Sequence, residues 1–379
     1  MINLQSATEN VNSILTEGSR LPIYSFFTGA GFLDLGFEKA GFITLAANEV
    51  HLPFMQGFEY GRDKLKSKGA CEKYLCSIDD FVTGKQKLPK RPAKSIPLGF
   101  IGGPPCPDFS VAGKQKGQAG ENGKLTGAYA QLICDQSPDW FLLENVKGLW
   151  RTKKHRKFYD EICQMFIMSG YCLTNKLINA IEYGVPQDRD RIILLGFKPK
   201  LIGKRKAGFL PEGEFPWDYG MKHDRVDVFS RPWPHRDPYQ SDPKRNPRCL
   251  AKLTVQHWFD KNNVKDHLNA DHAFVARAGL AKFKTIDEGD DSGKSYKRLH
   301  RWRYSPTAAY GNNEVHIHPY EPRRISVAEA LAIQSLPAKF SLPPDMTLSN
   351  MFKTIGNGVP YLAAEGIAAS INKYLKSCS

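Results

Sequence analysis

The sequence predicts an α/β fold, with a doubly wound, mostly parallel sheet and a smaller, irregular second domain. Short apolar runs alternate with helical patterns between residues 22 and 197, as in sheets built from strand–helix–strand units. A glycine turn separates the first apolar run from the first helical pattern, as in ligand-binding units of this class. Regular periodicity is lost between residues 201 and 310 and returns at 326–335 and 361–374.

Composition limits the class of protein. The chain has 379 residues, 41% of them hydrophobic, which suits two domains or one large domain with an insertion. Its formal net charge of +14 favours a polyanionic partner, with nucleic acid the first candidate and a merely basic protein the alternative. No apolar run approaches the roughly 20 residues that span a bilayer, and residues 1–20 lack the apolar core of a signal peptide. We therefore expect a cytoplasmic protein without membrane contact.

The cysteines give no sign of a metal site. There are eight, and they show neither a C-x-x-C pair nor the spacing of zinc ligands. We therefore expect reduced thiols and no bound metal.

The first strand, at 22–27, runs into a turn formed by Thr28, Gly29, Ala30 and Gly31, and a helical pattern follows. The two glycines allow a ligand to approach the backbone at the start of that helix. A second strand, at 42–47, leads to Glu49, which lies 20 positions after Gly29. That is the spacing at which an acidic residue binds a ribose diol in nucleotide-binding folds.

Residues 77–81 are expected to close a third strand, and residues 96–101 to form a buried fourth strand. The stretch after the fourth strand, 102–110, holds Cys106 among three prolines, which fix the backbone and prevent a helix. This turn suits either a reactive thiol at a sheet edge or a small buried side chain. The segment 111–127 is rich in glycine and lysine and is expected to be a mobile loop beside Cys106.

A helix at 126–135 and a strand at 140–143 should bring Glu144 to the same sheet edge as Cys106. A helix at 158–169 and strands at 171–178 and 191–197 follow. Gln187, Arg189 and Arg191 alternate before and into the last strand, so their side chains should point to one side. An ordinary surface strand would show the same alternation.

The segment 201–310 differs from the rest of the chain. It has 21 Lys and Arg against 14 Asp and Glu, four of the six tryptophans and six of the ten histidines. Basic residues interleaved with aromatic ones suit contacts with phosphates and bases. We expect a second domain here, with a structural insertion that only enlarges a cleft as the alternative.

Three motifs in this order resemble those of the DNA cytosine-5 methyltransferases of bacterial restriction–modification systems. They are Pro104-Pro105-Cys106, Glu144-Asn145-Val146 and Gln187-x-Arg189-x-Arg191, and the resemblance covers 23–198 and 305–375. It implies a Rossmann-like methyltransferase sheet with a target-recognition domain. The expected division is a leader at 1–20, a catalytic and cofactor-binding domain at 21–200, target recognition at 201–310, and a return to the catalytic domain at 311–379.

The resemblance implies four catalytic residues. Cys106 adds to carbon 6 of cytosine and so activates carbon 5. Glu144 protonates or hydrogen-bonds ring N3, Arg191 contacts the base oxygen, and Arg189 supports the site. Because carbon 6 is inaccessible within a duplex, the cytosine has to be flipped out.

The implied cofactor is S-adenosylmethionine. Its expected contacts are Phe27, Thr28, Gly29, Ala30, Gly31, Glu49, Val50, Ile78, Asp79, Pro104, Leu125, Asn357, Gly358 and Val359. The sequence departs from the family at several of these positions and near them. Val50 stands where an aromatic residue is common, Phe32 where glycine is common, and Cys76-Ser77-Ile78 where Gly-Asp-Ile is usual, which leaves Asp79 as the candidate for the adenine amino group.

Three further interpretations keep part of this evidence. A transfer-RNA methyltransferase shares the motifs, but Lys147-Gly148-Leu149-Trp150 follows Val146 where that group has a distinctive cysteine. A catalytically silent DNA-binding regulator would not need an intact Cys106, Glu144 and Arg191, and a nicotinamide-dependent oxidoreductase would explain only the first turn. The expected partner is double-stranded DNA, bound by a monomer, with a restriction endonuclease acting separately.

Overall fold

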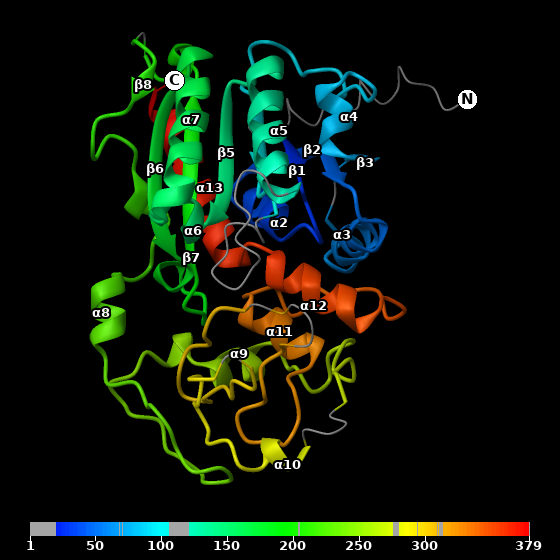
Figure 1. Ribbon diagram of the computed structural model, residues 1–379, viewed down its shortest axis with the longest axis vertical. Coiled ribbons are helices and arrows are strands. Elements are labelled where there is room, and N and C mark those ends of the chain that lie inside the picture. Colours follow the sequence, from blue (N-terminus) through cyan, green and yellow to red (C-terminus); the bar gives the residue numbers. More distant parts are fainter. Residues whose placement is uncertain are drawn as a thin grey trace.

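The structure is a computed structural model that describes residues 20–67, 69, 71–105, 121–203, 205–275, 280–293, 295–308, 310 and 314–378. It contains an eight-stranded sheet in the order β3-β2-β1-β4-β5-β7-β6-β8 (Figure 1). The strands are β1 (Leu21–Phe26), β2 (Phe42–Glu49), β3 (Glu72–Leu75), β4 (Gly99–Gly102), β5 (Trp140–Val146), β6 (Cys172–Asn179), β7 (Asp190–Phe197) and β8 (Gly208–Phe209). The predicted α/β class with a doubly wound sheet is confirmed.

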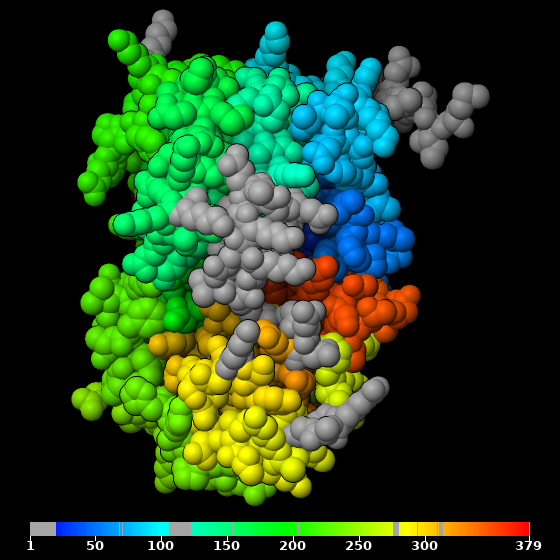
Figure 2. Space-filling view, viewed as in Figure 1, coloured from blue at the N-terminus to red at the C-terminus, as the bar shows by residue number. Residues whose placement is uncertain are grey.

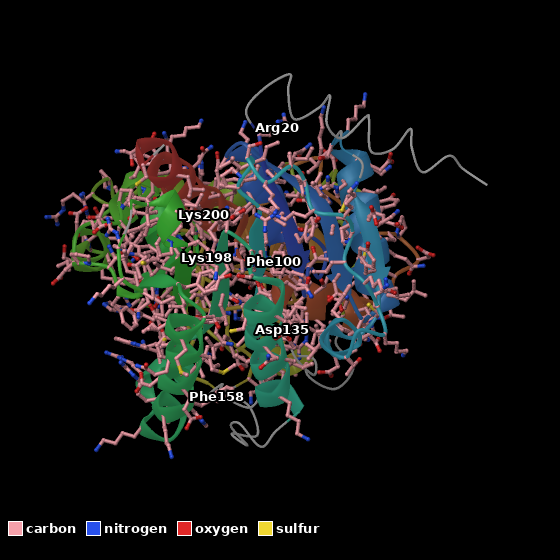
Figure 3. The ribbon with its side chains drawn as sticks, turned by 90° about the horizontal axis from the view of Figure 1, so that it is seen from above. Arg20, Phe100, Asp135, Phe158, Lys198 and Lys200 are labelled. Atoms are coloured by element: carbon pink, nitrogen blue, oxygen red, sulfur yellow. The ribbon has the colours of Figure 1, made fainter. Side chains whose placement is uncertain are left out.

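Helices cover both faces of the sheet, as the view from above shows (Figure 3). On one face lie α4 (Ile78–Val82), α5 (Glu121–Gln136) and α7 (Lys153–Met168), packed on a cluster that includes Phe100, Tyr129 and Phe141. On the other lie α2 (Phe32–Lys39) and α13 (Tyr361–Cys378), packed on a cluster that includes Phe37 and Trp140. Strands β1, β4 and β5, in the middle of the sheet, are buried on both faces, which is why their sequences read as nearly continuous hydrophobic runs.

One strand reverses direction. β7 is antiparallel to both β5 and β6, whereas every other pair in the sheet is parallel. In this register Arg191, near the start of β7, lies opposite Val146 at the end of β5. The reversal therefore brings the start of β7 to the sheet edge where the parallel strands end.

The expected third strand at 77–81 was wrong. β3 lies earlier, at Glu72–Leu75, and residues 78–82 form α4. Ser77 caps this helix by accepting from the backbone N–H of Asp79, and Asp80 accepts in return from the N–H of Ser77. These reciprocal bonds satisfy two of the N–H groups that a helix start leaves free, so the local sequence favours a helix. The loop expected at 111–127 is also helical from residue 121 onward, in α5.

The chain leaves the sheet half later than residue 201, where the second domain was expected to begin. β8 pairs with β6, and Phe215 and Trp217 pack beside Phe197. The backbone N–H groups of Lys222 and His223 donate to the carbonyl of Glu182, the last such bonds before the chain departs.

The smaller domain forms the lower half of Figure 1. It contains α8 (Arg225–Ser230), α9 (Val255–Lys261) and α10 (Leu280–Phe283), joined by long irregular segments. The chain returns at Ser305, which pairs with Gln187, and then α11 (Val327–Ile333) packs on α9 in one apolar cluster. α12 (Leu348–Asn357) lies at the border between the two halves (Figure 2).

Two further α-helices in the described part of the chain lie in the sheet half. α3 (Leu52–Lys64) follows β2, and α6 (Lys147–Arg151) follows β5. No helix in the described parts of the chain is both long and apolar enough to cross a membrane.

Candidate active site

Four parallel strands, β2, β1, β4 and β5, end at one edge of the sheet. The turn of Gly29 follows β1, Glu49 ends β2, Gly103 and Pro104 follow β4, and Glu144 lies two residues before the end of β5. In open α/β sheets ligands bind outside the carboxyl ends of the strands. The structure therefore gathers most of the sequence-predicted residues at the edge where a ligand is expected.

Glu144 is the best-defined acid of this edge. Its side chain is buried, and the Nε of Arg191 lies 2.8 Å from its Oε1. Its Oε2 faces the backbone of Gly103, because a Cβ placed on that glycine would lie 2.7 Å from this oxygen. Burial raises the pKa of Glu144, while Arg191 and Arg189 act in the opposite direction. A carboxyl group in such a site can keep or share a proton at a pH where an exposed glutamate has lost it.

The two arginines of the alternating row have different environments. Arg191 is partly exposed and its Nη1 donates to the carbonyl of Asp190, while its Nε pairs with Glu144. Arg189 is almost completely buried and donates to the carbonyls of Ala308, Gly356 and Gly358. Burial lowers the pKa of Arg189 well below its ordinary value. Arg191 can therefore reach a ligand, whereas Arg189 holds the surrounding backbone, in keeping with the supporting role expected for it.

Cys106 lies outside the described residues, as does most of the loop expected beside it. Pro104, two positions earlier, is described and buried. The backbone of Gly103, three positions before Cys106, lies beside the carboxyl group of Glu144.

The first glycine turn is tied to the end of β2. The N–H of Gly29 donates to Oε2 of Glu49 at 3.0 Å, and the N–H of His51 donates to its Oε1 at 2.9 Å. Burial raises the pKa of Glu49, although these backbone donors lower it. Thr28 is buried and its hydroxyl donates to Asp34. The carboxylate of Glu49 retains lone pairs for a ligand, since two oxygens offer about four acceptor sites.

A segment from the far end of the chain closes this turn. A Cβ on Gly358 would lie 2.4 Å from the ring of Phe32, so glycine is required where the two loops touch. Ala30 and Val359 are buried at the same place, and Asn357 is exposed. The end of α12 and the residues that follow it are thus neighbours of the glycine turn.

One buried hydroxyl near the turn has no partner. Oγ1 of Thr354, on α12, makes no hydrogen bond with any described residue, and it would lie 3.5 Å from a Cβ on Gly29. Gly29 and Gly31 both have positive φ, at 58° and 81°, and a Cβ on Gly31 would meet the ring of Phe58 at 2.6 Å. A bare backbone and a free buried hydroxyl are consistent with a polar ligand lying on this turn.

The remaining predicted cofactor residues form the rim. Phe27 and Leu125 are half-buried against the same apolar cluster that contains Ile78. Val50 is 64% exposed beside Glu49, and Asp79 is exposed at the start of α4 with Ser77 donating to its carboxylate. Phe27, Leu125 and Ile78 can form an apolar wall, while Val50 and Asp79 are accessible.

Sequence reasoning missed the buried polar network that joins the two halves. Gln334, on the C-terminal side of α11, donates to the carbonyl of Ile355, and its Oε1 lies 3.5 Å from Nε2 of Gln187. Gln187 in turn accepts from the N–H of Ala308. Gln334 and Ala308 lie 147 and 121 residues from Gln187 in sequence, so no local pattern could have revealed these two contacts.

Asp190 was also missed. Its carboxylate receives Lys147 at 2.5 Å, Arg225 at 2.9 Å and the side chain of Asn179 at 3.0 Å. Lys147 and Asn179 hold the pKa of Asp190 below its ordinary value despite burial. The available signal was the position of Asp190 between Arg189 and Arg191, the two arginines of the alternating row.

Comparisons with known proteins agree with this geometry. A family model described as C-5 cytosine-specific DNA methylase matches residues 21–373. The chain is 53% identical over 372 residues to the Type II methyltransferase M.NmeDI of Neisseria meningitidis serogroup C, covering 96% of this chain and 86% of that protein. It is 29% identical to the Type II methyltransferase M.FnuDI of Fusobacterium nucleatum, covering 94% and 95%.

Solved structures share the fold. A crystal structure described as a DNA modification methyltransferase encoded within a prophage, from E. coli, has a TM-score of 0.62 at 20% identity. It covers 94% of this chain and 99% of its own. The S. pombe Dnmt2 methyltransferase has a TM-score of 0.55 at 12% identity, with 94% and 99% covered. At these identities the likeness concerns the fold alone.

Proposed function

The chain belongs to the C-5 cytosine-specific DNA methylase family and is a DNA cytosine-5 methyltransferase, and from this premise we propose how it acts. It transfers a methyl group from S-adenosylmethionine to carbon 5 of a cytosine flipped out of a specific double-stranded sequence. The transfer passes through a covalent adduct between Cys106 and carbon 6. Since both relatives are Type II methyltransferases, we further propose that it protects bacterial DNA from a separate restriction endonuclease, working as a cytoplasmic monomer.

The observation that carries the proposal is the position of Glu144. Its buried carboxyl lies between Arg191 and the backbone of Gly103, three residues before Cys106. A cytosine whose carbon 6 faces that cysteine would present N3 and the exocyclic oxygen to the same wall. Glu144 then holds a proton at N3, and Arg191 donates to the oxygen.

The bond changes follow from this placement. The Cys106 thiolate forms the S–C6 bond while N3 takes or shares the Glu144 proton, which places electron density on carbon 5. Carbon 5 then takes the methyl group as the bond from that methyl to the sulfonium sulfur breaks, which leaves a thioether. A base next removes the carbon 5 proton, the S–C6 bond breaks with departure of the thiolate, and N3 returns its proton to Glu144. Protonation at N3 matters because it neutralises the charge that nucleophilic addition would otherwise put on the ring.

The glycine-turn edge fits S-adenosylmethionine. Glu49 would accept from the ribose hydroxyls, the apolar wall of Phe27, Ile78 and Leu125 would hold the adenine, and Asp79 is exposed for its amino group. Thr354 and the turn at Gly29 would face the methionine portion. Bound there, the cofactor supplies an electrophilic methyl group, and the protein contributes orientation and exclusion of water.

The test is Cys106→Ser, assayed by incorporation of tritiated methyl from S-adenosylmethionine into DNA. Serine keeps the size but lacks an accessible anion near neutral pH, so incorporation should fall below a few per cent of wild type while cofactor binding persists. Transfer to duplex DNA and to transfer RNA should be measured side by side. Incorporation into transfer RNA alone, or an active Cys106→Ser enzyme, would overturn the proposal.

A further inference from the structure

The surface formed by α6 and the first half of α7 is strongly basic and lies outside the site described above. Five of the seven residues from 151 to 157 are Lys or Arg. Arg151 and Lys153 are exposed and form no ion pair with any residue that the structure describes. The cationic charge of these two side chains is therefore available to a partner.

This charge is costly for the helix that carries it. α7 has 16 residues and no acidic residue in its first turn. A cation near a helix N-terminus opposes the helix dipole and destabilises the helix. Local stability therefore does not explain the run, whereas an external anion would.

The same surface is hollowed. A hollow of about 720 Å³ runs along one face of α7, and its lining includes Trp150, Arg151, Lys153, Arg156 and Lys157. Arg156 lies over the ring of Trp150, 5.4 Å from its centre, and pairs with Asp160, and Lys157 approaches Glu161. These contacts neutralise the middle of the hollow, so the free charge lies at the end formed by Arg151 and Lys153.

That end lies at the edge of the sheet that holds Glu144. α6 begins directly after β5, so only eight residues separate Glu144 from Lys153. α7 then runs back toward the start of β6, because β5 and β6 are both antiparallel to β7 and hence parallel to one another. In Figure 1, α6 lies below α7, on the side of the sheet half that faces the smaller domain.

We propose that Arg151 and Lys153 bind the phosphate backbone of DNA flanking the target base. This rests on the proposed function, since it assumes that the duplex presents its base to Glu144. A duplex engaged there must continue past the carboxyl edge of β5, and phosphates are the anions it carries at regular spacing. These contacts supply affinity that depends on salt and on duplex length but not on base sequence.

The experiment compares Arg151→Glu/Lys153→Glu with Lys87→Glu/Lys90→Glu. Lys87 and Lys90 are also exposed, but they precede β4 and so lie at the opposite edge of the sheet. Both pairs change the net charge equally. Dissociation constants are measured across a salt series on target duplexes of about 10 and about 30 base pairs, together with methyl transfer to the shorter one.

The Arg151→Glu/Lys153→Glu enzyme should bind the longer duplex about 10-fold more weakly than wild type. The slope of log affinity against log salt concentration should fall by about 2, since each lost phosphate contact removes about 0.9. Binding and methylation of the shorter duplex by this enzyme should change less than about twofold. Equal losses of DNA affinity in the two double variants would overturn the proposal. An unchanged salt slope would also overturn it, and that is the result expected if the hollow binds a protein partner. Failure of the wild-type enzyme to methylate either duplex would instead count against the proposed function.

Discussion

Gly103 and Glu144 are in backbone-to-carboxylate contact, and no other residue can replace the glycine without moving the acid. A Cβ at position 103 would lie 2.7 Å from Oε2 of Glu144, which is closer than such atoms approach in proteins. The carboxyl group cannot yield freely, because its other oxygen is paired with Arg191.

Gly103→Ala should therefore lower kcat/KM for DNA methylation about 100-fold, or about 2.7 kcal/mol, by displacing the Glu144 carboxyl. Gly127→Ala is the matched control, because a Cβ there has no described neighbour closer than 4.0 Å. Steady-state kinetics on one duplex would check both variants. A fully active Gly103→Ala enzyme would show that the acid can move without consequence.

The raised pKa of Glu144 predicts a pH-dependent rate. The neutral form of a group with a raised pKa persists above its ordinary value of 4.5, so proton donation should decline as pH rises through the folded pKa. Glu144→Gln removes this limb of the profile, and its low residual rate should be flat in that range. Single-turnover rates of the wild-type and Glu144→Gln enzymes from pH 5.5 to 9 test this. Glu161→Gln is the control, because Glu161 is an exposed acid on α7. The same slope in both variants would assign the limb to another group.

Arg189 should contribute to stability and to cofactor affinity through the backbone carbonyls to which it donates. Arg189→Met leaves the carbonyls of Ala308, Gly356 and Gly358 without their donor. Each unsatisfied buried carbonyl costs about 1–3 kcal/mol, so we expect the free energy of unfolding to fall by about 3 kcal/mol. Cofactor affinity should fall as well, because Gly358 contacts the glycine turn. Urea unfolding and calorimetric titration with S-adenosylmethionine would measure the two effects, and a loss of kcat with neither would contradict a supporting role.

Asp34 predicts a pH-dependent stability. It is fully buried behind the glycine turn, and burial raises its pKa from 3.8 to about 6, although the hydrogen bond from Thr28 lowers it. Since the folded protein binds this proton more tightly than the unfolded chain, stability should decrease as pH rises from about 4 to about 6 and then level off. Asp34→Asn lacks that charge, so above pH 7 it should be more stable than wild type by about 3 kcal/mol. Denaturant titrations at several pH values test the difference, and a difference that is constant with pH would exclude the titration of Asp34.

The sequence was informative where function depends on strand ends. Apolar runs located β1, β2, β4 and β5, and parallel strands necessarily bring Gly29, Glu49, Gly103 and Glu144 to one edge. The resemblance located Asn357, Gly358 and Val359 as a returning loop, and the contact between Gly358 and Phe32 agrees with that placement.

The sequence was less informative where the partners are distant or the signal is short. Alternation alone could not separate Arg191, which faces Glu144, from Arg189, whose acceptors lie up to 169 residues away. The segment 77–81 was assigned to a strand from its apolar residues, although Ser77 and Asp80 have the spacing of a capping box. β8 has two residues, too few for any periodicity to appear.

The last prediction concerns target choice, which we assign to the excursion between His223 and Ser305. The chain leaves the sheet half where Lys222 and His223 bond to Glu182, and it returns where Ser305 bonds to Pro186. The two acceptors, Glu182 and Pro186, lie within five residues of one another in the sheet half. The segment between His223 and Ser305 can therefore vary without moving the catalytic edge.

The composition of this excursion suits base reading, but less of its charge is free than the sequence suggests. Residues 224–304 carry 17 Lys and Arg against 11 Asp and Glu. Arg298 is buried and donates to the carbonyls of Phe283, Ile286 and His318, and Arg301 is paired with Glu288. Structural arginines of this kind order long segments that have little regular secondary structure. The remaining exposed cations would position DNA, and a smaller set of polar side chains would read base edges.

Replacing 224–304 with the corresponding segment of a relative of different specificity should transfer the relative's methylation site to the chimaera. The donor has to preserve the packing of α9 on α11, because Trp258 and Phe259 share an apolar cluster with Leu331. A second chimaera that exchanges only 205–222, which packs on the sheet, should keep the original site and serves as the control. Bisulfite sequencing of DNA from hosts that express each chimaera identifies the methylated sequence. A folded, active 224–304 chimaera that still methylates the original sequence would place recognition in the sheet half instead.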